Sequence, residues 1–359
     1  MEGISIPPRE VKNTIQDQKY GVEIELTGLT RERAAEVIAD YFGTEYTHEG
    51  SIYDTYSVRD NEGRKWKVVK DASIDCTDRH GNEAGSDHAV EFVTPICVYE
   101  DIPTIQQLVR NLRHNGALAN KSCGIHCHVN AAPFDARALR NLTNIMRAKE
   151  DLIYKALNVD PAREHRFCEK VDERFLQELN RKKPKTLDKI EDIWYAGYRE
   201  GRDRHYHSSR YRALNLHSLF YRGTIEYRLY NGTTHAGRIK TYIQLSLAIS
   251  NQALNQSCAS YRKMQSTNEK YTFRTWLLRL GMIGDEFKTA RKFLLENLDG
   301  CIAWKDPAQA LEQRERLKAA REQIKEQPEE QEEHSSVEQT SNADEQQDEE
   351  ETMPMGLAM

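Results

Sequence analysis

Charged or imidazole side chains recur at alternate positions in several extended segments of the chain. In chain order they are Glu23 with Glu25, Glu91, His126 with His128, and Glu226 with Arg228. Because successive side chains of a strand point to opposite faces, each pair shares one face and has apolar neighbours behind it. Solvent-facing positions of antiparallel strands produce the same alternation, so one pair alone would not indicate a site.

The recurrence of these pairs predicts a metal site. Adjacent carboxylates repel each other unless a cation lies between them. Glutamates with one neutral imidazole form a mostly oxygen ligand set, which suits Mg²⁺ or Mn²⁺. The candidate ligands are Glu23, Glu25, Glu91, His126 and Glu226. Zinc is less well supported, because Cys127 alternates to the face opposite the histidines and no CxxC pair occurs.

Arginine is the second chemical signal. Arg210 and Arg212 stand at the start of a predicted strand, which we expect to pair with the strand of Glu226 through a turn at residues 221–223. Guanidinium groups bind phosphate or carboxylate in a bidentate manner and stay charged. A metal and arginines on one sheet indicate a triphosphate, so we expect Arg210 and Arg212 to bind the nucleotide. The alternative is that they form surface salt bridges in a basic stretch.

Several other classes of protein are excluded by the sequence. The chain contains no GxxxxGK[ST] loop, no GxGxxG after a strand and no GxSxG elbow. Its seven cysteines, an odd number, fit reduced thiols better than a disulfide framework. No apolar run approaches the roughly 18 to 20 residues of a spanning helix, and no signal peptide is evident. We therefore expect a cytoplasmic protein without a membrane partner.

Hydrophobic periodicity indicates the elements that position these residues. Segments of period 2 alternate with segments of period 3.6, which predicts an α+β fold. The predicted strands are 20–27, 52–58, 65–70, 89–94, 124–130, 212–220 and 224–230. The predicted helices are 30–42, 102–115, 135–157, 187–198, 238–253, 273–280 and 286–298. Thr30 as N-cap and Gly43 as terminator bound the first of these helices.

Charge divides the chain into two parts. The formal net charge is −6, but residues 326–351 hold twelve acidic residues and no Lys or Arg, so the remainder carries +6. Residues 327–359 are rich in Glu, Gln and Ser and lack aromatic residues, so we expect a disordered acidic tail. Residues 306–326 predict an exposed charged helix. Residues 1–305 remain as the folded domain.

With these motifs in this order, the sequence resembles the amidoligase family, the carboxylate–amine ligases related to glutamine synthetase and glutamate–cysteine ligase. The matching segments lie between residues 20 and 255 and read YGVEIEL, WKVVKDAS, VEFVTP, GIHCHV, RYRALN and IEYRLYNG. The resemblance implies a glutamine synthetase-like catalytic fold over residues 1–305. This fold is a curved, mostly antiparallel sheet with flanking helices that holds ATP and Mg²⁺.

The resemblance also implies roles for individual residues. The four glutamates and His126 would hold the metal ions. Arg228 would contact phosphate, and His128 would ligate metal or orient the acyl group. Arg210 would contact either the substrate carboxylate or the γ-phosphate.

Asp71 and Ser73 end the segment WKVVKDAS. The resemblance implies that they border the nucleotide or the incoming amine, and Asp71 would accept the proton of that amine. Ala72 stands where many relatives have Gly, and this departure weakens the assignment. We expect residues 76–87, rich in Gly, Asp and His, to form a lid that keeps water out.

Three functions stay open at this point. The first is an ATP- and Mg²⁺-dependent ligase that joins a carboxylate to an amine through an acyl phosphate, forming an amide or isopeptide bond. A peptide or protein is one candidate substrate. The second is a metal-dependent hydrolase that uses His126 and His128. The third is a non-catalytic nucleic-acid-binding module, which the modest charge of +6 and the placement of aromatics in strands do not favour.

Overall fold

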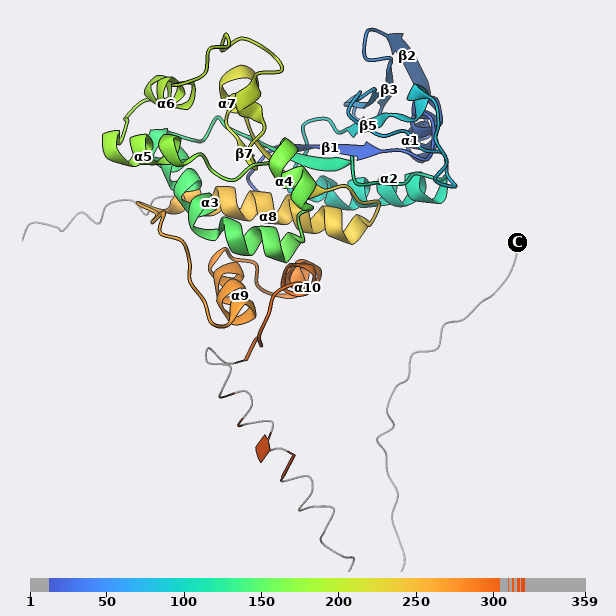
Figure 1. Cartoon of the computed structure of the whole chain (residues 1–359). Helices are drawn as coiled ribbons and strands as arrows, with labels where there is room; N and C mark the ends of the chain where they lie inside the picture. The colour runs from blue at the N-terminus through green and yellow to red at the C-terminus, as the bar shows by residue number, and fades with distance from the viewer. Residues whose placement is uncertain (1–12, 304–308, 310–311, 313–314, 317, 320–359) are drawn as a thin grey trace, which may run out of the picture. The chain divides into compact units, whose positions relative to one another are not determined.

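Eight strands form one antiparallel sheet in the computed structural model, which describes residues 13–303 together with 309, 312, 315, 316, 318 and 319 (Figure 1). The strands are β1 (Tyr20–Leu26), β2 (Tyr46–Gly50), β3 (Thr55–Arg59), β4 (Lys65–Val69), β5 (Val90–Val93), β6 (Gly124–Asn130), β7 (Leu214–Asn215) and β8 (Thr224–Asn231). Their order across the sheet is β2-β3-β4-β5-β1-β6-β8-β7. The predicted mixture of helices with an antiparallel sheet is confirmed, while the likeness to glutamine synthetase stays a prediction.

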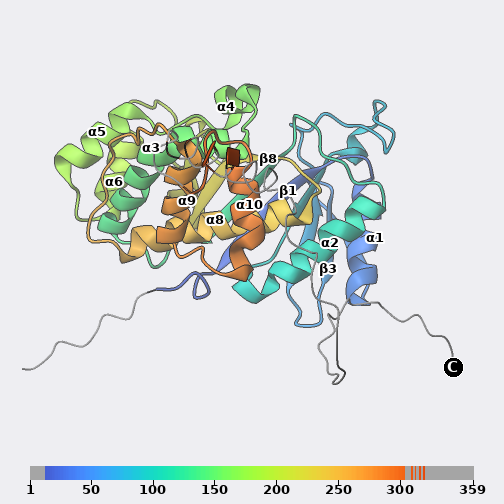
Figure 2. The same ribbon diagram turned by 90° about the horizontal axis from the view of Figure 1, so that it is seen from below.

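Helices flank this sheet. They are α1 (Arg31–Phe42), α2 (Ile102–His114), α3 (Ala136–Leu157), α4 (Pro161–Phe167), α5 (Glu173–Lys182), α6 (Leu187–Trp194), α7 (His217–Arg222), α8 (Ala236–Asn255), α9 (Glu269–Arg279) and α10 (Lys288–Leu295). Helices α2, α3 and α8 lie on one face of the sheet, and α10 packs against α3, α8 and α9 (Figures 1 and 2). These three helices do not cover the other face of the sheet, which we call the open face. It carries the charged side chains that could do chemistry.

The helix-covered face of the sheet is apolar. In β1, Val22, Ile24 and Leu26 are each at most 1% exposed and alternate with the two glutamates. Burying one such aliphatic side chain stabilises the fold by about 1.5–3 kcal/mol. A shift of the strand by one residue would carry the carboxylates into this apolar layer, so the apolar face determines where the carboxylates lie.

Strand β8 carries a β-bulge beside its charged residues. Between Ile125 and Cys127, β6 advances by two residues while its partners on β8 advance by three. The Tyr227 hydroxyl lies 2.8 Å from the Ser250 Oγ of α8, and the Tyr230 hydroxyl contacts α8 as well. Strict alternation would place Tyr230 with Arg228 on the open face, but the bulge turns it toward the helices.

Most predicted elements are confirmed to within a few residues. The first helix has Thr30 as its N-cap, whose side chain accepts from the Arg33 backbone N–H, and Gly43 with φ of 66° as its C-cap. Strand β6 spans the predicted residues 124–130. These successes follow from local signals, namely caps and periodicity.

The predicted strand 212–220 is wrong. Only Leu214–Asn215 forms a strand, β7, and the helix α7 follows directly. The Asn215 Oδ1 accepts from the His217 backbone N–H at 2.9 Å, which starts a helical turn, and Gly223 with φ of 74° ends the helix. The expected hairpin turn before β8 is therefore the end of α7.

The predicted strand 52–58 begins later than expected. Ser51 and Asp54 have φ of 72° and 44°, so residues 51–54 form a turn between β2 and β3. Strand β2 and helices α4 and α5 were not predicted. Their sequences are short and largely polar, so periodicity gives little signal.

The C-terminal predictions fall mostly beyond the described residues. In the predicted charged helix 306–326, residues 309, 312, 315, 316, 318 and 319 are helical and exposed. The predicted tail 327–359 lies outside the described part of the chain. Contacts divide the chain into the units Met1–Ala310 and Leu311–Met359. Within the described residues, no helix has both the length and the apolar character that crossing a bilayer requires.

Candidate active site

Four adjacent strands, β5, β1, β6 and β8, bring the predicted metal-ligating residues together on the open face of the sheet. Their registers create three cross-strand pairs, namely Glu25 with Glu91, Glu23 with His126, and His128 with Glu226. These residues are up to 203 positions apart in the chain. Antiparallel pairing of alternating strands places them on a single surface.

His126 lies at the centre of this surface and is 3% exposed. Its Nδ1 lies 3.1 Å from Glu23 Oε2 and 3.6 Å from Glu226 Oε1. Its Nε2 lies 3.6 Å from Glu25 Oε1. One imidazole thus faces three carboxylates from two other strands.

His128 leaves one ring nitrogen available. Its Nδ1 lies 3.1 Å from the Thr224 Oγ1. Its Nε2 lies 3.3 Å from Glu23 Oε1, yet it is buried without a hydrogen-bond partner among the described residues. A buried nitrogen in this state suits a metal ion, because a lone pair without a proton donor is a ligand position.

Three overlapping groups of side chains have ligand atoms within 4.8 Å of one another. They are Glu23 with His128 and Glu226, Glu23 with Glu91 and His126, and Glu25 with Asp71 and Glu91. Burial, together with the neighbouring Glu23, Asp71 and Glu25, raises the pKa of Glu91 well above its usual range. Glu91 also accepts no hydrogen bond from the described residues. A divalent cation would relieve this repulsion, so the donor set fits Mg²⁺ or Mn²⁺.

Two other carboxylates are held in the charged form. Burial favours neutral Glu23, but His128 and His126 outweigh it and bring the pKa of Glu23 well below its usual range. Burial also opposes charge on Glu226, yet Arg228 and the two histidines lower the pKa of Glu226 to about 2. Charged carboxylates are the form that binds metal.

Glu226 is fixed by two neighbours. Arg228, 4% exposed, pairs with its Oε1 through the guanidinium NH1. The Asn215 amide of β7 donates to its Oε2 at 2.7 Å. Asn215 is the last residue of the motif RYRALN, and the sequence predicted no role for it. The pairing of β7 with β8 places it beside Glu226, whose carboxylate it positions.

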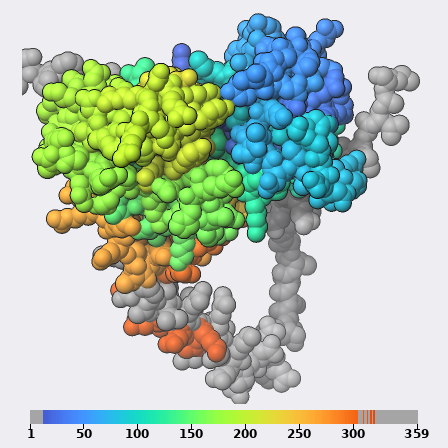
Figure 3. Space-filling view, turned by 45° about the horizontal axis from the view of Figure 1, so that its top comes forward, coloured from blue at the N-terminus to red at the C-terminus, as the bar shows by residue number. Residues whose placement is uncertain are grey.

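A cavity of about 700 Å³ opens over these strands. Glu23, Glu91 and Glu226 line it. The walls come from the turn before β3 and from residues 205–222, and Figure 3 shows these two regions, in blue and in yellow, meeting on one face. The hydroxyls of Tyr53 and Tyr206 lie 3.1 Å apart and connect the two walls.

The structure separates the two predicted arginines. Arg210 lines the cavity, and its guanidinium lies over the rings of Tyr206 and Tyr211 at 5.2 and 5.8 Å from their centroids. Arg212 instead pairs with Glu169 at 2.9 Å and Asp172 at 3.3 Å. The reason is that residues 208–210 form a 3₁₀ turn, which breaks the expected alternation.

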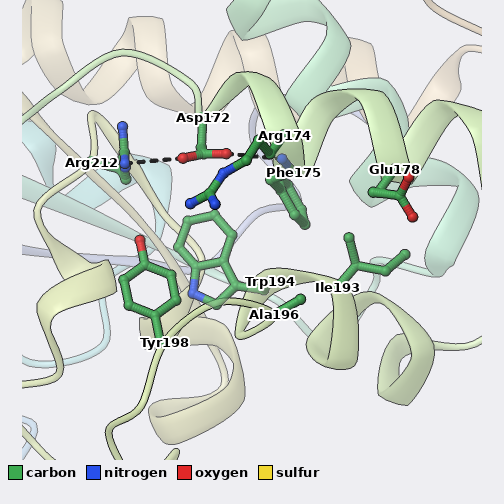
Figure 4. Close-up of a pocket in the computed structure, with 9 residues that line it drawn as sticks. All are labelled: Asp172, Arg174, Phe175, Glu178, Ile193, Trp194, Ala196, Tyr198 and Arg212. Carbon is green, nitrogen blue, oxygen red and sulfur yellow. Dashed lines mark hydrogen bonds and ion pairs between the residues drawn. The ribbon is translucent and has the colours of Figure 1, made fainter.

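Figure 4 shows where Arg212 lies. It borders a second cavity of about 200 Å³ beside α5 and α6, with a dashed contact to Asp172. Trp194, Phe175 and Ile193 give this cavity a largely apolar lining. None of the predicted metal ligands lines it.

Asp71 and Ser73 lie beside the carboxylates and line the 700 Å³ cavity. The Asp71 Oδ1 accepts from the Ser73 backbone N–H at 2.7 Å. The predicted lid, residues 76–87, contributes nothing to the lining of this cavity within residues 13–303. Thr77 is instead tied to Thr27 at the end of β1 by hydrogen bonds of 2.8 and 2.9 Å.

Arg222 is a cavity residue that sequence reasoning missed. Its NH1 lies 3.7 Å from Glu23 Oε1, and its NH2 lies 2.6 Å from the His205 Nε2. The sequence placed it in a supposed hairpin turn. Gly223 is a helix-ending residue, and reading it as the end of a helix would have placed Arg222 beside the site.

One family model, described as putative amidoligase enzyme, matches residues 16–250 of the chain. This range is more than half of the sequence and contains every carboxylate, histidine and arginine of the open sheet face. A search among curated proteins finds no match. Because the match covers the strands that assemble the site as well as the helices that support them, the chain belongs to the amidoligase family of ligases.

Proposed function

We propose that this protein is an ATP- and Mg²⁺-dependent ligase that joins a carboxylate to an amine through an acyl phosphate. One observation carries the proposal: cation-binding and anion-binding groups line the same cavity. Glu23, Glu91 and Glu226 lie in it together with Arg210 and Arg222. Phosphoryl transfer requires both kinds of group, because negative charge on the phosphates must be held and neutralised.

The metal-binding part of the proposal rests on the donor set. Glu23, Glu91 and Glu226, with His126 and His128, would hold Mg²⁺. When bound, the metal would neutralise charge that develops during phosphoryl transfer. The chain's own contribution is to keep the carboxylates ionised and fixed, and Arg228 does so for Glu226.

The remaining residues suit the later steps. A carboxylate is a poor electrophile, and phosphorylation by ATP gives it a good leaving group. The amine nitrogen then bonds to the carbonyl carbon, the bond from that carbon to the phosphate oxygen breaks, and Asp71 would take the proton of the amine. The contact between Tyr53 and Tyr206 joins the two cavity walls and would limit access of water.

The substrates are a carboxylic acid and an amine, with a peptide or protein as one candidate. The direct test incubates the purified protein with ATP, Mg²⁺ and cell extract and searches by mass spectrometry for a product that has lost one water. We expect ADP and phosphate to appear in proportion to this product. A product that forms without ATP, or hydrolysis supported by Zn²⁺ alone, would instead favour the metal-dependent hydrolase.

A pair of variants tests whether the site described above is responsible. Glu226→Gln keeps the shape of the side chain but removes the charge, so we expect it to abolish release of ADP. Glu178→Gln is the matched control, because Glu178 lies on α5 and pairs with Arg181 at 2.7 Å. Full turnover by Glu226→Gln would show that the metal assignment is wrong.

A further inference from the structure

A third and smaller cavity shares part of its lining with the 700 Å³ cavity, called the larger cavity below. Its volume is about 110 Å³, below the roughly 300 Å³ at which small-molecule pockets begin. It therefore has room for one functional group of a ligand. Arg163, Arg210 and Arg228 all line it. The carboxylates of Glu25 and Asp71 line it as well, so the three guanidinium groups leave an excess of positive charge, which favours an anion.

Arg163 is the unexpected member of this set. It belongs to α4 and is 3% exposed. Its NH1 donates to the backbone carbonyls of Cys123 at 2.9 Å and Ser122 at 3.4 Å. Within the described residues, its Nε has no hydrogen-bond partner and no carboxylate forms an ion pair with it. A buried guanidinium stays charged, so the absence of a counter-charge is unfavourable unless a ligand supplies one.

The surroundings of Arg163 hold it in this position. A Cβ on Gly124 would lie 2.1 Å from its NH2, so only glycine there leaves room for the guanidinium. The ring of Phe167, one helical turn further along α4, lies 5.7 Å from its Cζ. The carbonyl of Phe167 accepts from the Arg228 Nε at 3.5 Å. Phe167 thus contacts two of the three arginines.

Arg210 is the second guanidinium without a counter-charge. Its side chain forms no hydrogen bond or ion pair with the residues that the structure describes. Its contacts are the rings of Tyr206 and Tyr211, which orient a planar guanidinium without neutralising it. Arg210 lines both cavities. It therefore stands where a ligand in the larger cavity would extend into the smaller one.

We propose that Arg163 joins Arg210 and Arg228, the two arginines already expected to contact an anion, in a subsite for a single oxyanion, either a carboxylate or a phosphate group. Guanidinium groups bind such anions with two parallel hydrogen bonds, and Arg163 has donors to spare. This proposal rests on the proposed function in one respect, namely that the rest of the same ligand lies in the larger cavity. Arg163 gives the subsite a residue that no sequence motif indicated.

The test is a calorimetric titration of the full-length protein with inorganic phosphate and, separately, with malonate. We expect at least one probe to bind, and which one binds tells a phosphate source from a carboxylate source. Arg163→Gln and Arg210→Gln should each weaken that binding by about tenfold or more. Arg212→Gln is the matched control, because its ion pairs lie beside the cavity of Figure 4.

Because Arg163 is buried, a second variant guards against a loss of folding. Gly124→Ala keeps Arg163 but moves its guanidinium, since the new Cβ would occupy that position. We expect Gly124→Ala to weaken anion binding as much as Arg163→Gln does. The double variant of Gly124→Ala with Arg163→Gln should bind no more weakly than either single variant. Unchanged binding in Arg210→Gln and Gly124→Ala, equal weakening in Arg212→Gln, or no binding of either probe would overturn the subsite. Normal binding without ligase turnover would overturn only the proposed function.

Discussion

Two groups of histidines lie in the same part of the fold, and their surroundings shift histidine pKa values in opposite directions. The sheet histidines, His126 and His128, lie among carboxylates on β6. The stacked histidines, which we define as His205, His207 and His217, lie among aromatic rings, and His205 and His217 line the large cavity. Burial does not distinguish the groups, because His126 and His217 are both 3% exposed.

Carboxylates decide the behaviour of the sheet histidines. Burial alone would lower the pKa of His128, but Glu23 and Glu226 outweigh it and raise that pKa above its usual value. The same carboxylates surround His126. The carboxylates around His128 therefore favour a positive charge on that ring, which a proton or a metal ion can supply.

Burial among aromatic rings decides the behaviour of the stacked histidines. Burial, with a smaller contribution from His207, lowers the pKa of His217 to about 4. The His217 Nδ1 lies 2.5 Å from the Tyr195 hydroxyl, and its Nε2 lies 3.0 Å from the Arg204 carbonyl. The groups that face it are Tyr195, Arg204, His207, Arg210, Tyr221 and Glu226. These histidines stay neutral and act as packing residues, whereas the sheet histidines are suited to a cation.

The largest expected effect concerns metal binding. Glu23→Gln removes the carboxylate that both sheet histidines face, so we expect Mn²⁺ affinity to fall by about 100-fold. Titration followed by the EPR signal of free Mn²⁺ measures this. Glu200→Gln is the control, because its carboxylate accepts from the Ser208 backbone N–H at 2.9 Å, away from the sheet. If Glu23→Gln and wild type bound Mn²⁺ with equal affinity, the sheet histidines would not differ from the stacked histidines in binding metal.

The second prediction compares the groups directly through turnover. His128→Gln should lower kcat/KM for the proposed ATP-dependent condensation by about 10- to 100-fold, because a candidate metal ligand is lost. His217→Gln should lower it by only about two- to threefold, because it changes the packing of the cavity wall. Steady-state kinetics at pH 7.5 compares the two variants. A larger loss in His217→Gln would reverse the assignment.

The third prediction concerns acid stability. His217 has a folded-state pKa of about 4, below the value of about 6.5 for an unfolded chain. Its contribution to stability is therefore complete above about pH 6.5 and is lost as the pH falls toward 4. After allowance for solvent screening, the loss amounts to about 1–2 kcal/mol.

Melting temperatures from pH 7 to pH 4.5 measure this contribution. We expect His217→Gln to melt lower at pH 7 but to lose less on acidification, because glutamine does not titrate. His114→Gln, at an exposed position that ends α2, should keep the wild-type slope. The same slope in His217→Gln as in wild type would contradict a neutral buried His217.

The smallest expected effect concerns the contact that joins the stacked histidines to the opposite cavity wall. Tyr206 stacks on His205 at 4.4 Å, and its hydroxyl lies 3.1 Å from that of Tyr53. Tyr53→Phe and Tyr206→Phe should each raise KM about two- to fivefold and change stability by less than about 1 kcal/mol. The double variant should equal either single one, because the two hydroxyls share one interaction. Additive effects on KM would show that they act separately.

Much of the fold could be predicted from local sequence. Thr30 and Gly43 bound α1 as expected, and β6 spans the predicted residues. The pairs Glu23 with Glu25 and His126 with His128 occur on strands that the alternation predicted. These features depend on neighbours within a few residues, which is the range over which periodicity and capping act.

Other parts of the site could not be predicted in this way. Arg210 and Arg212 have the same spacing as the other pairs, but a 3₁₀ turn sends them to different cavities. Arg163 belongs to a short polar helix without a motif, and it reaches the sheet only because Gly124 leaves room for it. Both outcomes depend on segments far apart in the chain.

The sequence by itself determined which side chains exist and which face of each strand carries them. It also determined that β1 and β6 would bury one face, because alternating apolar residues leave no other stable arrangement. Only the tertiary structure decided what each charged group meets. Strand order placed Glu23 between the two sheet histidines, while the turn into α7 placed His217 among rings. Burial alone lowers a histidine pKa, and nearby carboxylates raise it. The neighbours of each histidine therefore decide whether its site favours a positive charge or the neutral ring.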